Sequence, residues 1–317
     1  MMKRAFSIFG LAVLLLMGLA DQPPAGAQAR PRVVSSFSIV GELVARVGGD
    51  RIEHRVLVGA NTDTHTYEPT PQDTAALTAA TVVFQNGLGF EPWLDRLYRA
   101  SGSRAEQINL AQGIPTLVLP GDADATGHSD ADGHGHQPGE LDPHVWHDVS
   151  NVIQMAAEVR DSLTAIDPDG GSIYRANAEQ YIRELETLDI WIQQQVAMVA
   201  PERRKLVTSH DTFAYFARRY GFEIVGTALG SVSTEVADPS AGAVVGLINE
   251  IRAAGVTTIF AENVSNPRLM EQIASAAGVR LVDDLSTDAL GERDTPSATY
   301  DGLMRHNVTR IVEALRP

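Results

Sequence analysis

The feature that most constrains the fold is an alternation that begins at Arg32, in which short strand-like runs are followed by segments of helical period. Val33–Ile39 and Thr81–Gln85 are two of the strand-like runs, and Glu42–Val47 and Glu91–Ser101 are the helical segments that follow them. Short apolar strands alternating with amphipathic helices are typical of parallel sheets whose two faces are covered by helices. The sequence therefore predicts an α/β fold made of repeated βα units.

One helical segment is long enough to link two such βα arrays. Ser172–Val199 keeps a helical period without glycine or proline, whereas helices of globular proteins average about 11–12 residues. We predict a rigid connecting helix over 171–200, an N-terminal α/β lobe over 30–170 and a C-terminal α/β lobe over 201–317. Because ligands of such folds bind beyond the carboxyl ends of the strands, we expect the binding site in the cleft between the lobes.

Residues 1–29 have the pattern of a secretory signal peptide. Lys3 and Arg4 form a positive start, Ala5–Ala20 is almost wholly apolar, and Ala27–Ala29 places small residues at a cleavage site. The apolar stretch is shorter than the about 20 residues that a membrane-spanning helix needs. A bacterial lipid anchor is attached to a cysteine, and the sequence contains none. We therefore expect an exported protein that is free in the periplasm and is not lipid-anchored.

Composition excludes several classes of function. The formal net charge of −15 argues against nucleic acid and anionic membranes as partners, because binding phosphate groups needs a cationic face. The absence of cysteine excludes a disulfide scaffold, a cysteine-ligated zinc site, an iron–sulfur cluster and a thiol nucleophile. An acidic chain is compatible with binding a cation.

Histidine is the residue type whose placement is most informative. His65, His144 and His210 lie in loops between expected strands and helices, and each has a carboxylate within two residues. In metal sites such a carboxylate fixes the tautomer of the imidazole. The three are too far apart in sequence for a zinc knuckle, but ligands on strand-end loops of two lobes would converge in the cleft. For each histidine taken alone, a structural role in the core or at the surface is the alternative.

The sequence around these histidines also resembles a known family. The strings that carry the resemblance are His65–Pro69 (HTYEP), Asn86–Glu91 (NGLGFE), Asp142–Trp146 (DPHVW), Ser209–Asp211 (SHD), Ser233–Glu235 (STE), Ile259–Glu262 (IFAE) and Thr287–Gly291 (TDALG). Over essentially the whole chain after the signal peptide, the sequence is similar to the metal-binding solute receptors of bacterial ABC transporters, the cluster that includes ZnuA and TroA.

The resemblance implies a function and a set of ligands. It implies a periplasmic receptor, not an enzyme, that captures Zn²⁺ with high affinity and delivers it to the inner-membrane permease of an ABC importer. The four implied metal ligands are His65, His144, His210 and Asp288. On spacing alone Asp283 and Asp284 compete with Asp288; we prefer Asp288 because it lies in the matching TDALG string, and expect the other two to face solvent.

The donor set bears on which metal is bound. Three imidazoles and one carboxylate suit four-coordinate Zn²⁺, whereas Mn²⁺ prefers more oxygen ligands. In the family that the chain resembles, manganese receptors tend to carry a carboxylate where His210 stands. The alternative is a manganese or iron receptor of the same family. A secreted zinc hydrolase would need an open ligand position for water, which a fourth protein ligand fills; an adhesin is the remaining alternative.

A stretch over 121–139 is rich in histidine and aspartate and predicts a mobile surface loop. We predict that its histidines, His128, His134 and His136, form an accessory zinc site. It would capture zinc weakly and pass it inward, or receive it from a periplasmic metallochaperone. The alternative is a solvated loop whose histidines are incidental. His147 stands where the family usually has an apolar residue, and we expect no metal role for it. We expect the protein to be a monomer.

Overall fold

The computed structural model describes residues 30–118, 141–264 and 266–316. The predicted signal peptide (1–29) and the whole of the predicted histidine-rich loop (121–139) lie outside this part of the chain. Residues 31–317 group by their contacts into one compact unit, so the division into lobes at 170 and 201 stays a prediction. Among the described helices, none is both long and apolar enough to cross a membrane.

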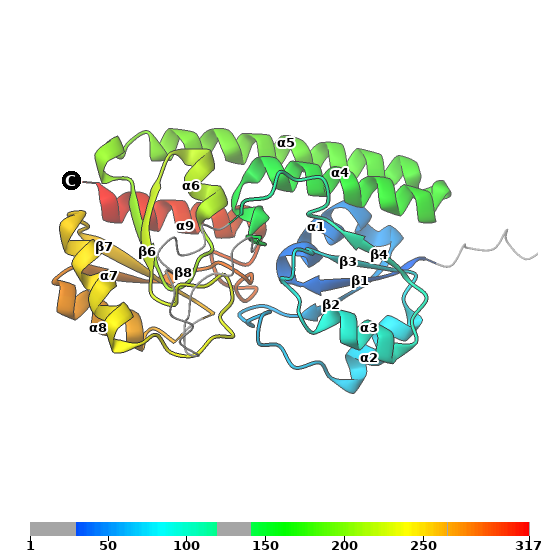
Figure 1. Cartoon of the computed structure of the whole chain (residues 1–317). Coiled ribbons are helices and arrows are strands. Elements are labelled where there is room, and N and C mark those ends of the chain that lie inside the picture. Colours follow the sequence, from blue (N-terminus) through cyan, green and yellow to red (C-terminus); the bar gives the residue numbers. More distant parts are fainter. Residues whose placement is uncertain (1–29, 119–140, 265, 317) are drawn as a thin grey trace, which may run out of the picture. The chain divides into compact units, whose positions relative to one another are not determined.

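The N-terminal half is built on a four-stranded sheet in which every neighbouring pair of strands is parallel (Figure 1). The spatial order of the strands is β2-β1-β3-β4. All but the first residue of β1 are buried, which explains its continuous apolar run. The elements of this half are β1 Arg32–Phe37, α1 Ser38–Gly48, β2 Glu53–Val58, α2 Pro71–Ala79, β3 Val82–Gln85, α3 Leu94–Ser101 and β4 Glu106–Asn109.

The C-terminal half contains two parallel strand pairs, β5 with β6 and β7 with β8. The two pairs are adjacent, since β5 contacts β7. The elements here are β5 Lys205–Thr208, α6 Ala214–Tyr220, β6 Glu223–Thr227, α7 Ala241–Ala253, β7 Thr258–Glu262, α8 Arg268–Ala277, β8 Arg280–Leu285 and α9 Tyr300–Leu315. The predicted α/β fold with parallel sheets is therefore confirmed.

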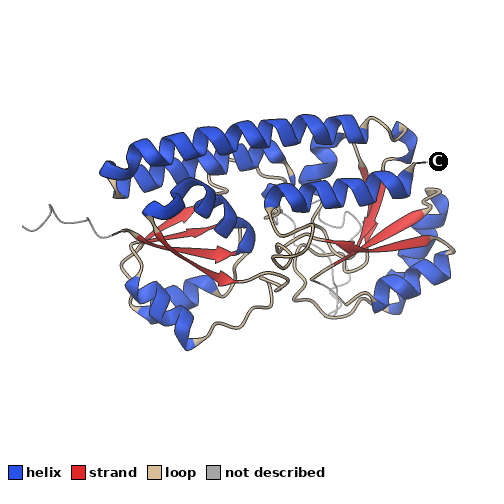
Figure 2. Cartoon of the chain, turned by 180° about the vertical axis from the view of Figure 1, so that it is seen from behind, coloured by secondary structure: helices blue, strands red, loops and turns tan. Residues whose placement is uncertain are grey.

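The predicted long helix is α5, Gly171–Val196, which follows α4, Val149–Ile166 (Figure 2). Helix α5 packs on α1 and α4, and also on α6 and α9 of the C-terminal half. Near its start Asp167 accepts hydrogen bonds from Arg51 (2.7 and 2.8 Å) and from the Tyr174 hydroxyl (2.7 Å). Its buried face recurs every three or four residues, the pattern of an amphipathic helix: Tyr174, Ala178, Tyr181, Leu185, Leu188, Ile192 and Val196.

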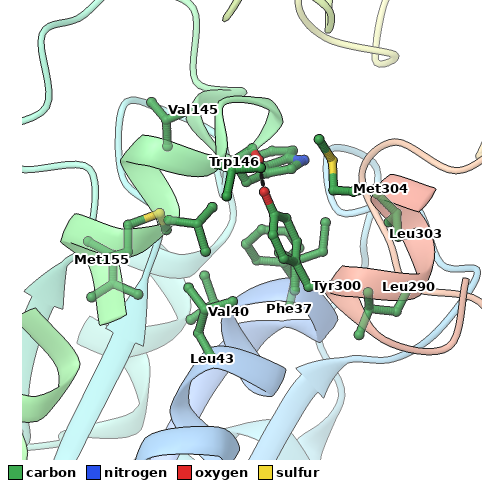
Figure 3. Packing of buried hydrophobic residues seen from close by; sticks show 14 of the residues in the cluster. Phe37, Val40, Leu43, Val145, Trp146, Met155, Leu290, Tyr300, Leu303 and Met304 are labelled. Carbon is green, nitrogen blue, oxygen red and sulfur yellow. Dashed lines mark hydrogen bonds between the residues drawn. The ribbon is translucent and has the colours of Figure 1, made fainter. Parts of the chain in front are cut away.

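The main hydrophobic core includes residues of both halves. At its centre Trp146 packs against Phe37, with ring centroids 5.3 Å apart, and the Tyr300 hydroxyl donates to the Trp146 carbonyl oxygen at 2.7 Å (Figure 3). The Trp146 indole N–H donates to the carbonyl oxygen of Thr287 at 3.0 Å. These contacts fix the short 3₁₀ turn Val145–His147 from several sides, and with it the residue that precedes the turn.

Candidate metal centre

Four buried side chains from both halves of the molecule converge on one point. They are the four that the sequence singled out, and one ligand atom of each lies within 4.8 Å of the others: His65, His144, His210 and Asp288. Asp288 Oδ2 is 3.1 Å from His210 Nε2 and 3.4 Å from His65 Nε2, and Asp288 Oδ1 is 3.8 Å from His144 Nε2. Within the described residues, the three Nε2 atoms and Asp288 Oδ2 are buried without a hydrogen-bond partner. A shared cation would satisfy all four.

The positions of these residues follow from the fold. His65 lies in the loop between β2 and α2, His210 comes two residues after β5, and Asp288 follows β8. Because parallel strands end at the same edge of a sheet, the loops after them bring distant residues together. His144 comes directly before the 3₁₀ turn that the core fixes. His65 is 4% exposed and the other three are fully buried, so His65 is the residue nearest to solvent.

A hollow of about 530 Å³ lies on the His65 side of the centre. Its lining includes His65, Glu68, Trp93 and Arg96 of the N-terminal half and Glu235 of the C-terminal half. Two glutamates and one arginine make the lining of this hollow charged beside His65.

Second carboxylates hold two of the imidazoles in the tautomer that a metal needs. Asp142 Oδ1 accepts hydrogen bonds from the His144 backbone N–H at 2.9 Å and from its ring Nδ1 at 2.8 Å. Glu262 Oε2 is hydrogen-bonded to His210 Nδ1, and its Oε1 accepts from the backbone N–H groups of Ser209 at 2.9 Å and His210 at 3.2 Å. With the proton on Nδ1, the lone pair of Nε2 points into the centre.

The charges of the centre are strongly coupled. Burial would lower the pKa of His210, but the charges of Glu262 and Asp288 raise this pKa well above its usual value. Burial would raise the pKa of Asp288, yet the charges of His210 and His144 hold it well below its usual range. Burial lowers the pKa of His65. A metal ion that binds His210 Nε2 therefore competes with a proton for that nitrogen.

The remaining candidates of the sequence analysis fall elsewhere. Asp283 and Asp284 are exposed, as expected, and Asp284 accepts a hydrogen bond from Arg310 at 2.8 Å. His128, His134 and His136 lie outside the described residues.

The structure gives two residues near the centre surroundings that the sequence did not predict. Glu262 is the carboxylate that binds His210, where sequence proximity pointed to Asp211. The available signals were its place in the IFAE string and at the end of β7. His147 is fully buried beside Thr212, at 3.2 Å.

Several proteins of known role are similar to this chain over most of its length. A manganese-binding lipoprotein, MntA, from Halalkalibacterium halodurans is 34% identical over 90% of this chain and 88% of its own. The periplasmic zinc-binding protein TroA from Treponema pallidum has 28% identity and a TM-score of 0.80, covering 91% of this chain and 100% of its own. A manganese-bound periplasmic metal-binding protein from Candidatus Liberibacter asiaticus has 26% identity and a TM-score of 0.76, covering 89% and 98%.

These relatives correct one expectation. MntA and the FimA and PsaA proteins of streptococci are named lipoproteins. The prediction of a protein free in the periplasm, without a lipid anchor, is therefore wrong. It relied on one compositional fact, the lack of cysteine, which does not outweigh the naming of these relatives as lipoproteins.

The family assignment follows from fold, site and similarity together. Residues 33–314 match the family described as zinc-uptake complex component A, periplasmic (ZnuA). The chain thus belongs to this family of metal-binding ABC-transporter receptors, which are substrate-binding proteins and not enzymes.

Proposed function

We propose that this protein captures one first-row divalent metal ion at His65, His144, His210 and Asp288 and delivers it to the permease of an ABC importer. The observation that carries the proposal is the convergence of three imidazole Nε2 atoms and one carboxylate oxygen, all buried and without hydrogen-bond partners in the described chain. Three imidazoles and a carboxylate are ligands for first-row divalent ions. Asp142 and Glu262 orient two of the imidazoles toward the ion.

Manganese is the metal that we propose as cargo. The naming of MntA proteins as manganese-binding supports this choice, as does the manganese-bound solved structure from Candidatus Liberibacter asiaticus. In the site, both carboxylate oxygens of Asp288 face imidazoles. A carboxylate that binds through both oxygens raises the coordination number above four, as Mn²⁺ prefers.

Zinc is the second candidate. The donor set of three imidazoles and one carboxylate is one that Zn²⁺ accepts with four ligands, and TroA is named as zinc-binding. Zinc also binds most such sites more tightly than manganese, so affinity alone does not identify the cargo. Metal content after growth with both metals, set beside the affinities, separates the two candidates.

The test is a competitive titration of the purified protein with Mn²⁺ and Zn²⁺. We expect one tight site per chain, and its loss in the Asp288→Ala and His210→Ala variants. A protein without residues 121–139 tests the accessory role proposed for His128, His134 and His136. Tight binding that survives both alanine substitutions, or disappears with the loop, would contradict the proposed site.

A further inference from the structure

His147 is a buried histidine that the four-ligand site leaves unused. Its side chain is fully buried, and its ring lies against Phe213 and Trp146, with centroids 4.7 and 5.7 Å away. Its Nε2 is 3.2 Å from Thr212 Oγ1, and its Nδ1 has no hydrogen-bond partner among the described residues. An apolar side chain would fill this space without stranding a nitrogen. The contact with Thr212 is therefore what distinguishes histidine here.

The number of protons on His147 and Thr212 determines which group donates in each of their hydrogen bonds. A neutral imidazole has one N–H and one bare nitrogen. A proton on Nδ1 would leave a buried N–H donor unpaired, which is rarer in proteins than an unpaired acceptor. The favoured tautomer of His147 thus has its proton on Nε2 and donates to Thr212 Oγ1. The hydroxyl of Thr212 then has its own single proton to place, and Asp288 Oδ1, at 3.4 Å, accepts it.

This chain of contacts ends on the carboxylate of the metal centre. The torsion that turns an aspartate carboxylate about its axis is broad, so the plane of the group is not fixed by the side chain itself. In Asp288, Oδ2 lies 3.1 Å from His210 Nε2 and Oδ1 lies 3.8 Å from His144 Nε2. In the plane that the structure shows, the two oxygens face different imidazoles, and Thr212 Oγ1 donates to Oδ1 at 3.4 Å.

We propose that His147 and Thr212 are positioning residues that hold the Asp288 carboxylate with both oxygens toward the metal, and thereby favour Mn²⁺ over Zn²⁺. The inference rests on the proposed metal-receptor function. Zn²⁺ is satisfied by four ligands and needs only one oxygen of Asp288. Mn²⁺ takes more oxygen ligands and a higher coordination number, so it depends on the second oxygen.

The test compares His147→Leu and Thr212→Val with the wild-type protein. In each variant we expect Mn²⁺ affinity to fall by about 10–100-fold, the usual effect of removing a partner of a ligand. Zn²⁺ affinity should change by less than about threefold, because the four direct ligands remain. The visible absorption of bound Co²⁺ should grow more intense in both variants, as a five-coordinate ion loses one oxygen and becomes four-coordinate.

Controls separate positioning from folding. Thr212→Ser keeps the hydroxyl and should retain the wild-type ratio of affinities, and the double variant should be no worse than either single one. Thermal unfolding of the metal-free proteins checks that each variant is folded.

Two outcomes decide against the proposal. If the variants lose affinity equally for Mn²⁺ and Zn²⁺, or lose affinity for neither, the positioning role is overturned and the receptor function stays in place. A wild-type protein that binds neither metal overturns the proposed function itself, and the positioning role with it.

Discussion

Thr234 Oγ1 donates a hydrogen bond of 2.5 Å to Oδ2 of Asp63, a residue 171 positions away in the sequence. The other oxygen of the same carboxylate, Oδ1, accepts the backbone N–H of His65 at 2.9 Å. One side chain therefore joins the loop that carries His65 to the segment between β6 and α7 of the C-terminal half. The loop that carries His65 is thus tied to the C-terminal half by a hydrogen bond between two loops.

Removing the Thr234 hydroxyl should speed the release of bound metal. A hydrogen bond to a charged group contributes about 1.5–3 kcal/mol, so Thr234→Val is expected to raise the dissociation rate about tenfold or more. The rate is measured by mixing the loaded protein with an excess of chelator. Thr234→Ser, which keeps the donor, should release metal at the wild-type rate. An unchanged rate in the valine variant would show that the bond does not restrain the His65 loop.

Loss of the carboxylate behind His144 should weaken metal binding. Asp142→Asn removes the charge that holds the His144 Nδ1 proton, and such changes typically reduce affinity by about 10–100-fold. The dissociation constant is measured by competition with a chelator of known affinity. Asp161→Asn is a matched control, because Asp161 is an acidic residue of α4 that pairs with Arg160 at the surface. Equal effects of the two substitutions would point to net charge as the cause.

Metal binding near pH 7 should release about one proton per ion. Glu262 and Asp288 raise the pKa of His210 well above its usual value, so its imidazole is protonated before the metal arrives and must become neutral to bind. Calorimetric titrations in buffers of different ionisation enthalpy give the number of protons. Affinity should fall as the pH is lowered, since protons compete for the same nitrogen. Binding heats that are independent of the buffer would contradict this account.

The stability of the metal-free protein should decrease below about pH 6.5 in part because of His54. Burial lowers the pKa of His54 to about 4, from 6.5, while its Nε2 lies 2.8 Å from Ser35 Oγ. Between about pH 6.5 and 4 the unfolded chain binds a proton at His54 that the folded chain does not. The contribution of His54 to stability is therefore lost as the pH falls through this window, and it is constant above about pH 6.5. At about 1.4 kcal/mol per pKa unit the full effect is about 3 kcal/mol.

Urea unfolding at several pH values measures this contribution. His54→Gln removes the titrating group and should give a shallower decline of the unfolding free energy between about pH 6.5 and 4. The same decline in both proteins would assign the loss of stability to other groups.

The fold was predictable because its signals are local. Hydrophobic periods of two residues for strands and about 3.6 for helices can be recognised in any short stretch of sequence. The helical period of Ser172–Val199 predicted α5, which begins at Gly171 and ends at Val196. The three histidine ligands and Asp288 could be identified from the sequence because each lies in a distinctive sequence motif. Asp142, the hydrogen-bond partner of His144, could also be identified, because it lies in the same motif two residues away.

What the sequence could not supply depends on contacts between distant elements. Glu262 reaches His210 because β5 and β7 lie side by side, a relation that no local pattern encodes. The burial of His147 depends on Phe213 covering its ring. The choice of metal depends on the orientation of the Asp288 carboxylate, since the same four side chains accept both ions.

The unbroken helix α5 also limits how this receptor can report that it is loaded. Because one rod of helix is packed on α1 and on α6 and α9 alike, the halves cannot swing apart without breaking core contacts along its length. We therefore expect occupancy to be signalled by rearranged surface loops, among them those joined by Asp63 and Thr234. The permease would then distinguish the loaded receptor from the empty one by the conformation of these loops on one face of the protein.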